Sequence, residues 1–208
     1  MNIEKLKNAQ AYFFALYPKG FKDEALQPIV KRHNTAKIGE KVKEMFAQDN
    51  FAQPELICEN FTKIVSRSSL ISVFEKPKVR DMIKGMGHEQ KDMLSIGLYE
   101  LIYGNKKAGF ESLVDVLLMH GLAKWSIITL IPYYYAREKN FFIKPTTTKN
   151  VIKFFELKGL VYKPRPTYEF YVAYTKALKK MKSQLKSSIS NDNAGFTGFL
   201  MMAMQEQS

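Results

Sequence analysis

The side chains with the clearest chemistry in this 208-residue sequence are lysines gathered in its last third. Residues 141–186 hold 11 basic and two acidic side chains, which gives this segment +9 of the chain's net charge of +12. Several lysines that neutralise phosphates together release counterions, and the result is salt-dependent binding with little sequence preference. We therefore expect a surface for nucleic acid or another polyanion. A lysine-rich face that only keeps the protein in solution is the alternative interpretation.

The charges have a direction in the helix expected from Tyr168 to about Lys186. Its tyrosines, leucines and methionine repeat every three and four residues, which places them on one side of a helix. The helix should therefore bury an apolar stripe and present a ridge of lysines to solvent. The lysines that form this ridge include Lys176, Lys179 and Lys180.

Residues 144–150, KPTTTKN, predict the start of another helix at Pro145, with a threonine as its cap. The first turn of a helix has free N–H groups and a dipole that favours anions. Lys144 and Lys149 flank this turn and would strengthen an anion site. An ordinary threonine cap that holds no ligand is the alternative.

Residues 146–163 resemble the recognition-helix segment of winged helix-turn-helix DNA-binding domains. Residues 146–152 would open the helix, and residues 154–163, FFELKGLVYK, match the family's passage from the helix into the wing. The resemblance implies that side chains early in this helix enter the major groove. Those side chains are Thr147, Lys149, Asn150 and Lys153.

Two features depart from the winged family. Residues 163–166, KPRP, offer no clear returning strand for the wing, and Phe154 with Phe155 widens the apolar face of the helix. The two prolines could instead hold an extended arm that carries Arg165 outward.

The expected nucleic-acid interface collects the polar residues of these three features. It comprises Lys144, Thr147, Lys149, Asn150, Lys153, Lys163, Arg165, Lys176, Lys179 and Lys180. The stretch from residue 124 to residue 168 also resembles a family of uncharacterised bacterial proteins, and that resemblance implies no activity.

Catalytic and metal-binding patterns are not found. His33, His88 and His120 each stand without a second ligand at helical spacing, and Cys58 is the only cysteine. Neither a phosphate-binding glycine loop nor a dinucleotide fingerprint occurs. We expect no metal, no cofactor and no catalytic residues, while an enzyme with an unrecognised site stays an alternative.

Apolar spacing predicts an all-α fold of around ten helices. Residues 94–102 and 110–118 carry two such stripes, joined by a very short turn, and should pack as an antiparallel hairpin. Residues 125–135 are apolar on all sides, as expected of a helix buried at the centre of a domain. Further stripes occupy residues 38–46 and 56–65.

Strand signals are confined to two short runs, at residues 141–143 and 160–162. They suggest one small hairpin or wing near residues 141–163. No glycine- or serine-rich linker divides the chain, so we expect one domain over residues 1–208 that contains the basic segment 141–186.

The last residues have a separate character. Residues 195–204 are apolar and include three methionines, which suits a groove for a partner or a contact in a homo-oligomer. A last helix folded back onto the core is the competing interpretation. A protein–protein interaction module that uses this tail is therefore the main alternative to nucleic-acid binding.

The location is expected to be cytoplasmic, with no membrane partner. No signal peptide with a cleavage site is evident, and no apolar run approaches the roughly 20 residues that span a bilayer. A single cysteine cannot form an intrachain disulfide, which fits a reducing compartment.

Overall fold

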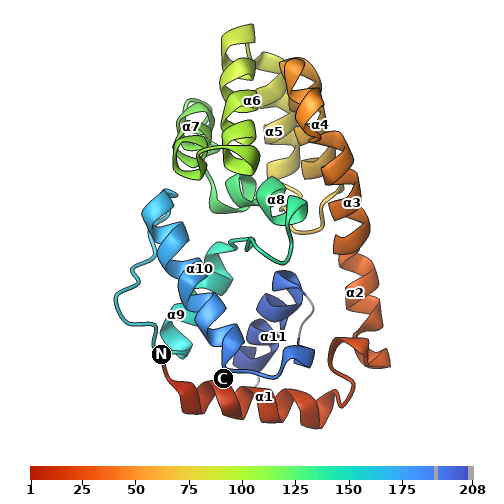
Figure 1. The fold of residues 1–208 in the computed structure, drawn as a ribbon, viewed down its shortest axis with the longest axis vertical. Coiled ribbons are helices and arrows are strands. Elements are labelled where there is room, and N and C mark those ends of the chain that lie inside the picture. Colours follow the sequence, from red (N-terminus) through yellow and green to blue (C-terminus); the bar gives the residue numbers. More distant parts are fainter. Residues whose placement is uncertain (190–191, 206–208) are drawn as a thin grey trace.

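The computed structural model describes residues 1–189 and 192–205, and α-helices joined by short 3₁₀ turns make up its regular structure (Figure 1). The all-α prediction is confirmed. The helices are α1 (Ile3–Leu16), α2 (Gln27–His33), α3 (Thr35–Met45), α4 (Pro54–Arg67), α5 (Glu75–Gly85), α6 (His88–Tyr103), α7 (Lys106–Leu118), α8 (Trp125–Tyr135), α9 (Pro145–Phe154), α10 (Tyr168–Ser183) and α11 (Asn193–Gln205).

The helices gather at two ends of the molecule. In Figure 1, α4–α7 lie at one end, and α1, α9 and α11 lie at the other, with α2 and α3 running along one side between them. The buried apolar side chains of both ends form one continuous core.

Helix α8 lies at the centre of this core. Every residue from Trp125 to Tyr134 is buried, as its uniform apolar character predicts. The helix has only 11 residues and contains Pro132. In the part of the chain that the structure describes, no helix is long and apolar enough to cross a membrane.

The predicted hairpin of α6 and α7 is confirmed, and its closeness depends on Gly109. A Cβ atom there would lie 2.4 Å from the backbone nitrogen of Leu101, so only glycine allows the two helices to approach this far. Asn105 caps the start of α7, because its Oδ1 accepts hydrogen bonds from the N–H groups of Lys107 and Ala108. This cap fixes the place of Lys106, the first residue of α7.

Helix α10 has the amphipathic form expected from its sequence. Tyr174, Leu178 and Met181 are buried, whereas Lys176 and Lys179 are exposed. The Thr167 hydroxyl caps the helix by accepting a hydrogen bond from the Phe170 N–H.

Helix α11 lies folded back against α1 and α9. Phe196, Phe199 and Leu200 are fully buried there, while Met201 and Met202 are half-buried. The tail thus places most of its large apolar side chains in the chain's own core. The homo-oligomer contact expected from the tail stays a prediction.

The hairpin or wing expected near residues 141–163 is not found, since the described residues contain no strand. Phe141 and Ile143 are buried in the core, and the Ile143 N–H donates to the Thr129 hydroxyl of α8 at 3.0 Å rather than to a neighbouring strand. On the other side, the Lys163 carbonyl accepts a hydrogen bond from the Trp125 indole at 2.8 Å. Each extended run is therefore bonded to α8, and the two do not pair with each other.

Candidate polyanion site

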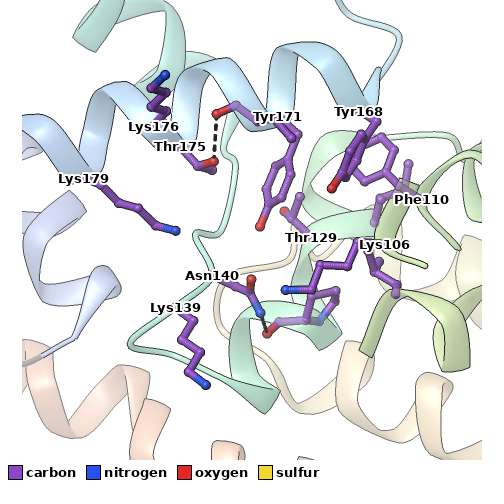
Figure 2. A pocket seen from close by; sticks show the side chains of 14 residues that line it. Lys106, Phe110, Thr129, Lys139, Asn140, Tyr168, Tyr171, Thr175, Lys176 and Lys179 are labelled. Atoms are coloured by element: carbon purple, nitrogen blue, oxygen red, sulfur yellow. Dashed lines mark hydrogen bonds between the residues drawn. The ribbon is translucent and has the colours of Figure 1, made fainter. Parts of the chain in front are cut away.

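A cavity of about 290 Å³ opens between α7 and α10, with α8 forming its floor (Figure 2). Its lining combines cations, neutral polar groups and aromatic rings. These residues are Lys106, Lys139, Lys176 and Lys179, then Thr129, Asn140 and Thr175, then Phe110, Tyr168 and Tyr171.

The four lysines carry charge that no carboxylate of the cavity neutralises. No carboxylate lines the cavity, and among the described residues none of these four ammonium groups takes part in an ion pair. In the view of Figure 2, Lys106 and Lys179 extend toward the cavity from opposite sides, while Lys139 and Lys176 lie at its margin with their ammonium groups pointing away from it. An anion inside the cavity would be attracted first by Lys106 and Lys179.

The neighbouring lysine of α7 shows the contrast. Lys107 forms ion pairs with Glu111 at 3.7 Å and with Glu169 of α10 at 3.2 Å. These partners raise the pKa of Lys107, and the hydrogen bond that Lys107 donates to Glu169 has the largest effect. The pair with Glu169 also ties the start of α10 to α7 at the edge of the cavity. Two adjacent lysines thus have different roles, one in an ion pair and one facing the cavity.

Aromatic rings form one wall. Phe110 is buried and stacks on Tyr171, with ring centroids 5.6 Å apart and an angle of 28° between the planes. Tyr168 is partly exposed, and its ring centroid lies 5.7 Å from that of Phe110. Burial raises the pKa of the Tyr171 phenol, which therefore stays protonated at neutral pH.

The floor is held by polar side chains. The Thr129 hydroxyl donates to the Trp125 carbonyl at 2.7 Å. Asn140 donates a hydrogen bond through Nδ2 to the Pro132 carbonyl at 2.8 Å. The main-chain carbonyl of Asn140 accepts a hydrogen bond from Asn193 Nδ2 at 3.0 Å. These bonds fix the segment that carries Lys139 before any ligand arrives.

Two of the residues predicted from the sequence, Lys176 and Lys179, line this cavity. Lys106 and Lys139 join them and were missed, because both lie outside the basic segment 141–186. The asparagine cap at Asn105 was a usable signal for a helix that begins at Lys106, but it gives no information on what that lysine faces.

The other predicted residues are distributed elsewhere. Lys144 and Thr147 line a second cavity, and Thr147 is only 6% exposed. The Lys149 ammonium lies over the Tyr162 ring, 5.8 Å from its centroid. The exposed remainder, none of which lines either cavity, comprises Asn150, Lys153, Lys163, Arg165 and Lys180.

The cysteine and two of the three histidines singled out in the sequence lie in ordinary structural surroundings in the part of the chain that the structure describes. No three His, Cys, Asp or Glu side chains there lie close enough together to hold a metal ion. Cys58 is buried, and burial raises the pKa of its thiol to about 12, so little thiolate exists at neutral pH. His88 contacts Glu55, and His33 contacts Ser69, each at 2.9 Å.

Comparison with known proteins adds no family. No family model matches the chain, and neither curated proteins nor solved structures give a significant match. The resemblance of residues 146–163 to a winged helix-turn-helix segment therefore stays a prediction. The case for a function rests on the cavity and its lysines.

Proposed function

We propose that the protein binds a phosphate-bearing polyanion, with nucleic acid as the favoured class, through the lysine-lined cavity between α7 and α10. The observation that carries this proposal is the meeting of four lysines at one cavity that no carboxylate lines. Two of these lysines belong to the basic helix α10, one begins α7, and one lies in the turn after α8.

The arrangement suits a flexible strand. Lys106 and Lys179, on opposite sides of the cavity, can hold phosphates between them, while Lys139 and Lys176 extend the positive surface along its margin. The exposed part of Tyr168 offers a face on which a base can stack. A basic groove beside an aromatic ring is the usual combination in proteins that bind single strands without strong sequence preference.

The test is the salt dependence of binding to a labelled single-stranded oligonucleotide, measured by fluorescence anisotropy. Replacing Lys106 and Lys179 with glutamine should lower the slope of log K against log salt by roughly 0.7 for each phosphate that is no longer neutralised. Lys180→Gln is the matched control, because Lys180 adjoins Lys179 on α10 but lies outside the cavity.

The control also separates two interpretations of the lysines. If α10 binds through its whole lysine ridge, Lys180→Gln will weaken binding as much as Lys179→Gln does. If the cavity binds, only Lys179→Gln will have an effect. Equal effects, or no binding by the unaltered protein, would contradict the proposal.

A further inference from the structure

A second and larger cavity, of about 420 Å³, lies where α2, α9 and α11 meet. Its size falls in the range of small-molecule sites. The walls are mostly apolar and include Ile29, Val30, Leu70, Phe142, Met201 and Met202. Methionine side chains are flexible, so this wall can adapt its shape to an apolar chain.

One buried hydroxyl at this cavity lacks a hydrogen bond. Tyr174 of α10 lines the cavity and is 1% exposed. Burial raises the pKa of Tyr174, and the Thr148 side chain lies close enough to lower it in part, but among the described residues this contact lacks the geometry of a full hydrogen bond to the Tyr174 Oη. A buried hydroxyl without a partner is costly, and buried polar groups in proteins nearly always have one. A ligand oxygen would supply that partner once a small side-chain shift uncovers the Oη, which has almost no accessible surface in the free protein.

The cavity also borders an unusually positive helix end. Lys144 occupies the N-cap position of α9 and provides no capping hydrogen bond. A cation at this end is opposed by the helix dipole, which favours an anion there. Thr147 and Thr148 of the first turn line the cavity beside Lys144, so this end of α9 faces the same space as Tyr174.

The remaining charged groups leave this region positive. Lys22 and His33 line the cavity as well, and its acidic lining residue, Asp192, is ion-paired with Arg137 at 2.9 Å. Partial burial, with the nearby charges of Arg32 and Lys144, lowers the pKa of His33. His33 is therefore mostly neutral at neutral pH, and Lys144 and Lys22 supply the attraction for a negative group.

We propose that this cavity binds a long-chain carboxylate, such as a fatty acid. The hydrocarbon chain lies between α2 and α11, and the carboxylate lies at the start of α9. There it accepts hydrogen bonds from Tyr174 Oη and the Lys144 ammonium. This site is separate from the lysine-lined cavity and does not depend on it.

The chemistry of the walls selects this occupant. A nucleic-acid strand or an extended peptide would bring many polar groups against apolar side chains, and each group left without a partner costs free energy. A fatty acid brings one charged group and an apolar chain. Its burial is favourable in proportion to the apolar area removed from water.

The experiment compares dodecanoate with dodecan-1-ol by isothermal titration calorimetry on the full chain. The unaltered protein should bind dodecanoate about tenfold more tightly than the alcohol, since a hydrogen bond to a charged group is worth more than one to a neutral group. Lys144→Gln should remove most of this difference and leave the affinity for the alcohol unchanged. Lys153→Gln, on the same helix but outside the cavity, is the matched control.

Two further variants keep the test decisive. Tyr174→Phe should weaken dodecanoate binding about fivefold without lowering the melting temperature, because it removes a hydroxyl that has no partner in the free protein. Gly198→Leu should block both ligands. A Cβ at residue 198 makes only ordinary contacts with the Phe21 ring, the nearest at 3.6 Å, so the longer side chain can occupy the cavity while the helix stays folded.

Three results would overturn the proposal. They are no saturable binding of dodecanoate, equal affinity for acid and alcohol, and dodecanoate binding that Lys144→Gln and Tyr174→Phe leave intact. Lys106→Gln should not change dodecanoate binding, so this inference and the polyanion proposal can fail separately.

Discussion

The two cavities of this protein differ in what their side chains lack. The cavity between α7 and α10 has four lysines with no carboxylate in its lining, whereas the cavity among α2, α9 and α11 has apolar walls and one buried hydroxyl without a hydrogen bond. The first lining suits a partner with several negative charges in a row. The second suits a partner with a single polar head and an apolar body. The charges without a counter-ion in one cavity and the hydroxyl without a hydrogen bond in the other therefore distinguish the two sites more than their volumes do.

The largest expected effect is on the stacked aromatic wall of the first cavity. Phe110 is buried among Trp125, Tyr168 and Tyr171. Phe110→Ala should lower the free energy of unfolding by about 3–5 kcal/mol, since it leaves a void in a packed core. Urea denaturation measures the loss. Phe74→Ala is the control, because Phe74 is 79% exposed, and an equal loss there would show that the wall is not special.

The second-largest expected effect is the difference in how ligand binding at the two cavities depends on salt concentration. If four phosphates are neutralised, raising the salt from about 50 to 200 mM should weaken oligonucleotide binding roughly 50-fold, because each neutralised phosphate of a single strand adds about 0.7 to the slope. Dodecanoate carries one charge, so its affinity should change by less than about threefold over the same range. Parallel titrations at three salt concentrations measure both. A similar salt response for the two ligands would mean that the comparison is wrong.

A buried ionisable group outside both cavities gives a smaller, pH-dependent effect. Burial raises the pKa of Cys58 from 9.0 to about 12, so above pH 9 the unfolded chain loses this proton more readily than the native protein does. Stability that is present at lower pH is therefore lost as pH rises, by about 1 kcal/mol between pH 9 and pH 10. Thermal unfolding at both pH values measures this loss.

Cys58→Ala isolates the effect, because other groups titrate in the same range. The variant should lose less stability than the unaltered protein over that pH step. If both proteins respond alike, the thiol does not have the raised pKa. Ligand binding to either cavity should be unchanged in the variant, since Cys58 lines neither.

The smallest expected effect concerns the unpaired hydroxyl of the second cavity. Tyr174→Phe should leave the free protein as stable or raise its free energy of unfolding by up to about 1 kcal/mol. For a chain of this length, that gain corresponds to roughly 2–4 °C in melting temperature. A clear loss of stability would show that the hydroxyl already has a partner in the folded protein.

The sequence predicted the elements far better than the cavities. The continuous apolar run of α8 and the one-sided pattern of α10 are local properties, and local patterns determine helices and their buried faces. The lysine-lined cavity instead joins α7, α10 and the turn at Lys139, which lie far apart in the chain. Only the packing of α6 on α7, with Gly109 between them, brings Lys106 to its place.

The second cavity was out of reach of the sequence for a similar reason. Pro145 correctly indicated the start of α9, but the expected threonine cap was wrong. Lys144 occupies the N-cap position without a side-chain hydrogen bond, and Thr147 and Thr148 lie inside the helix and are buried. Their burial depends on α10 and α11, whose positions no local pattern specifies. Residues 141–143 have the β-branched and aromatic character of a strand. In the structure, Phe141 and Ile143 are buried in the core, and the Ile143 N–H donates a hydrogen bond to Thr129 of α8 in place of a second strand.

A short bridge separates the two cavities. Arg137, which follows α8, forms an ion pair with Asp192, just before α11. The main-chain carbonyl of Asn140 accepts a hydrogen bond from Asn193, the first residue of α11. Asn140 lines one cavity and Asp192 lines the other. Substitutions at these four positions will disturb both at once, so none of them can serve as a selective probe. Variants that test the two proposed binding sites separately have to lie at the outer walls, where Lys106 and Gly198 line one cavity each.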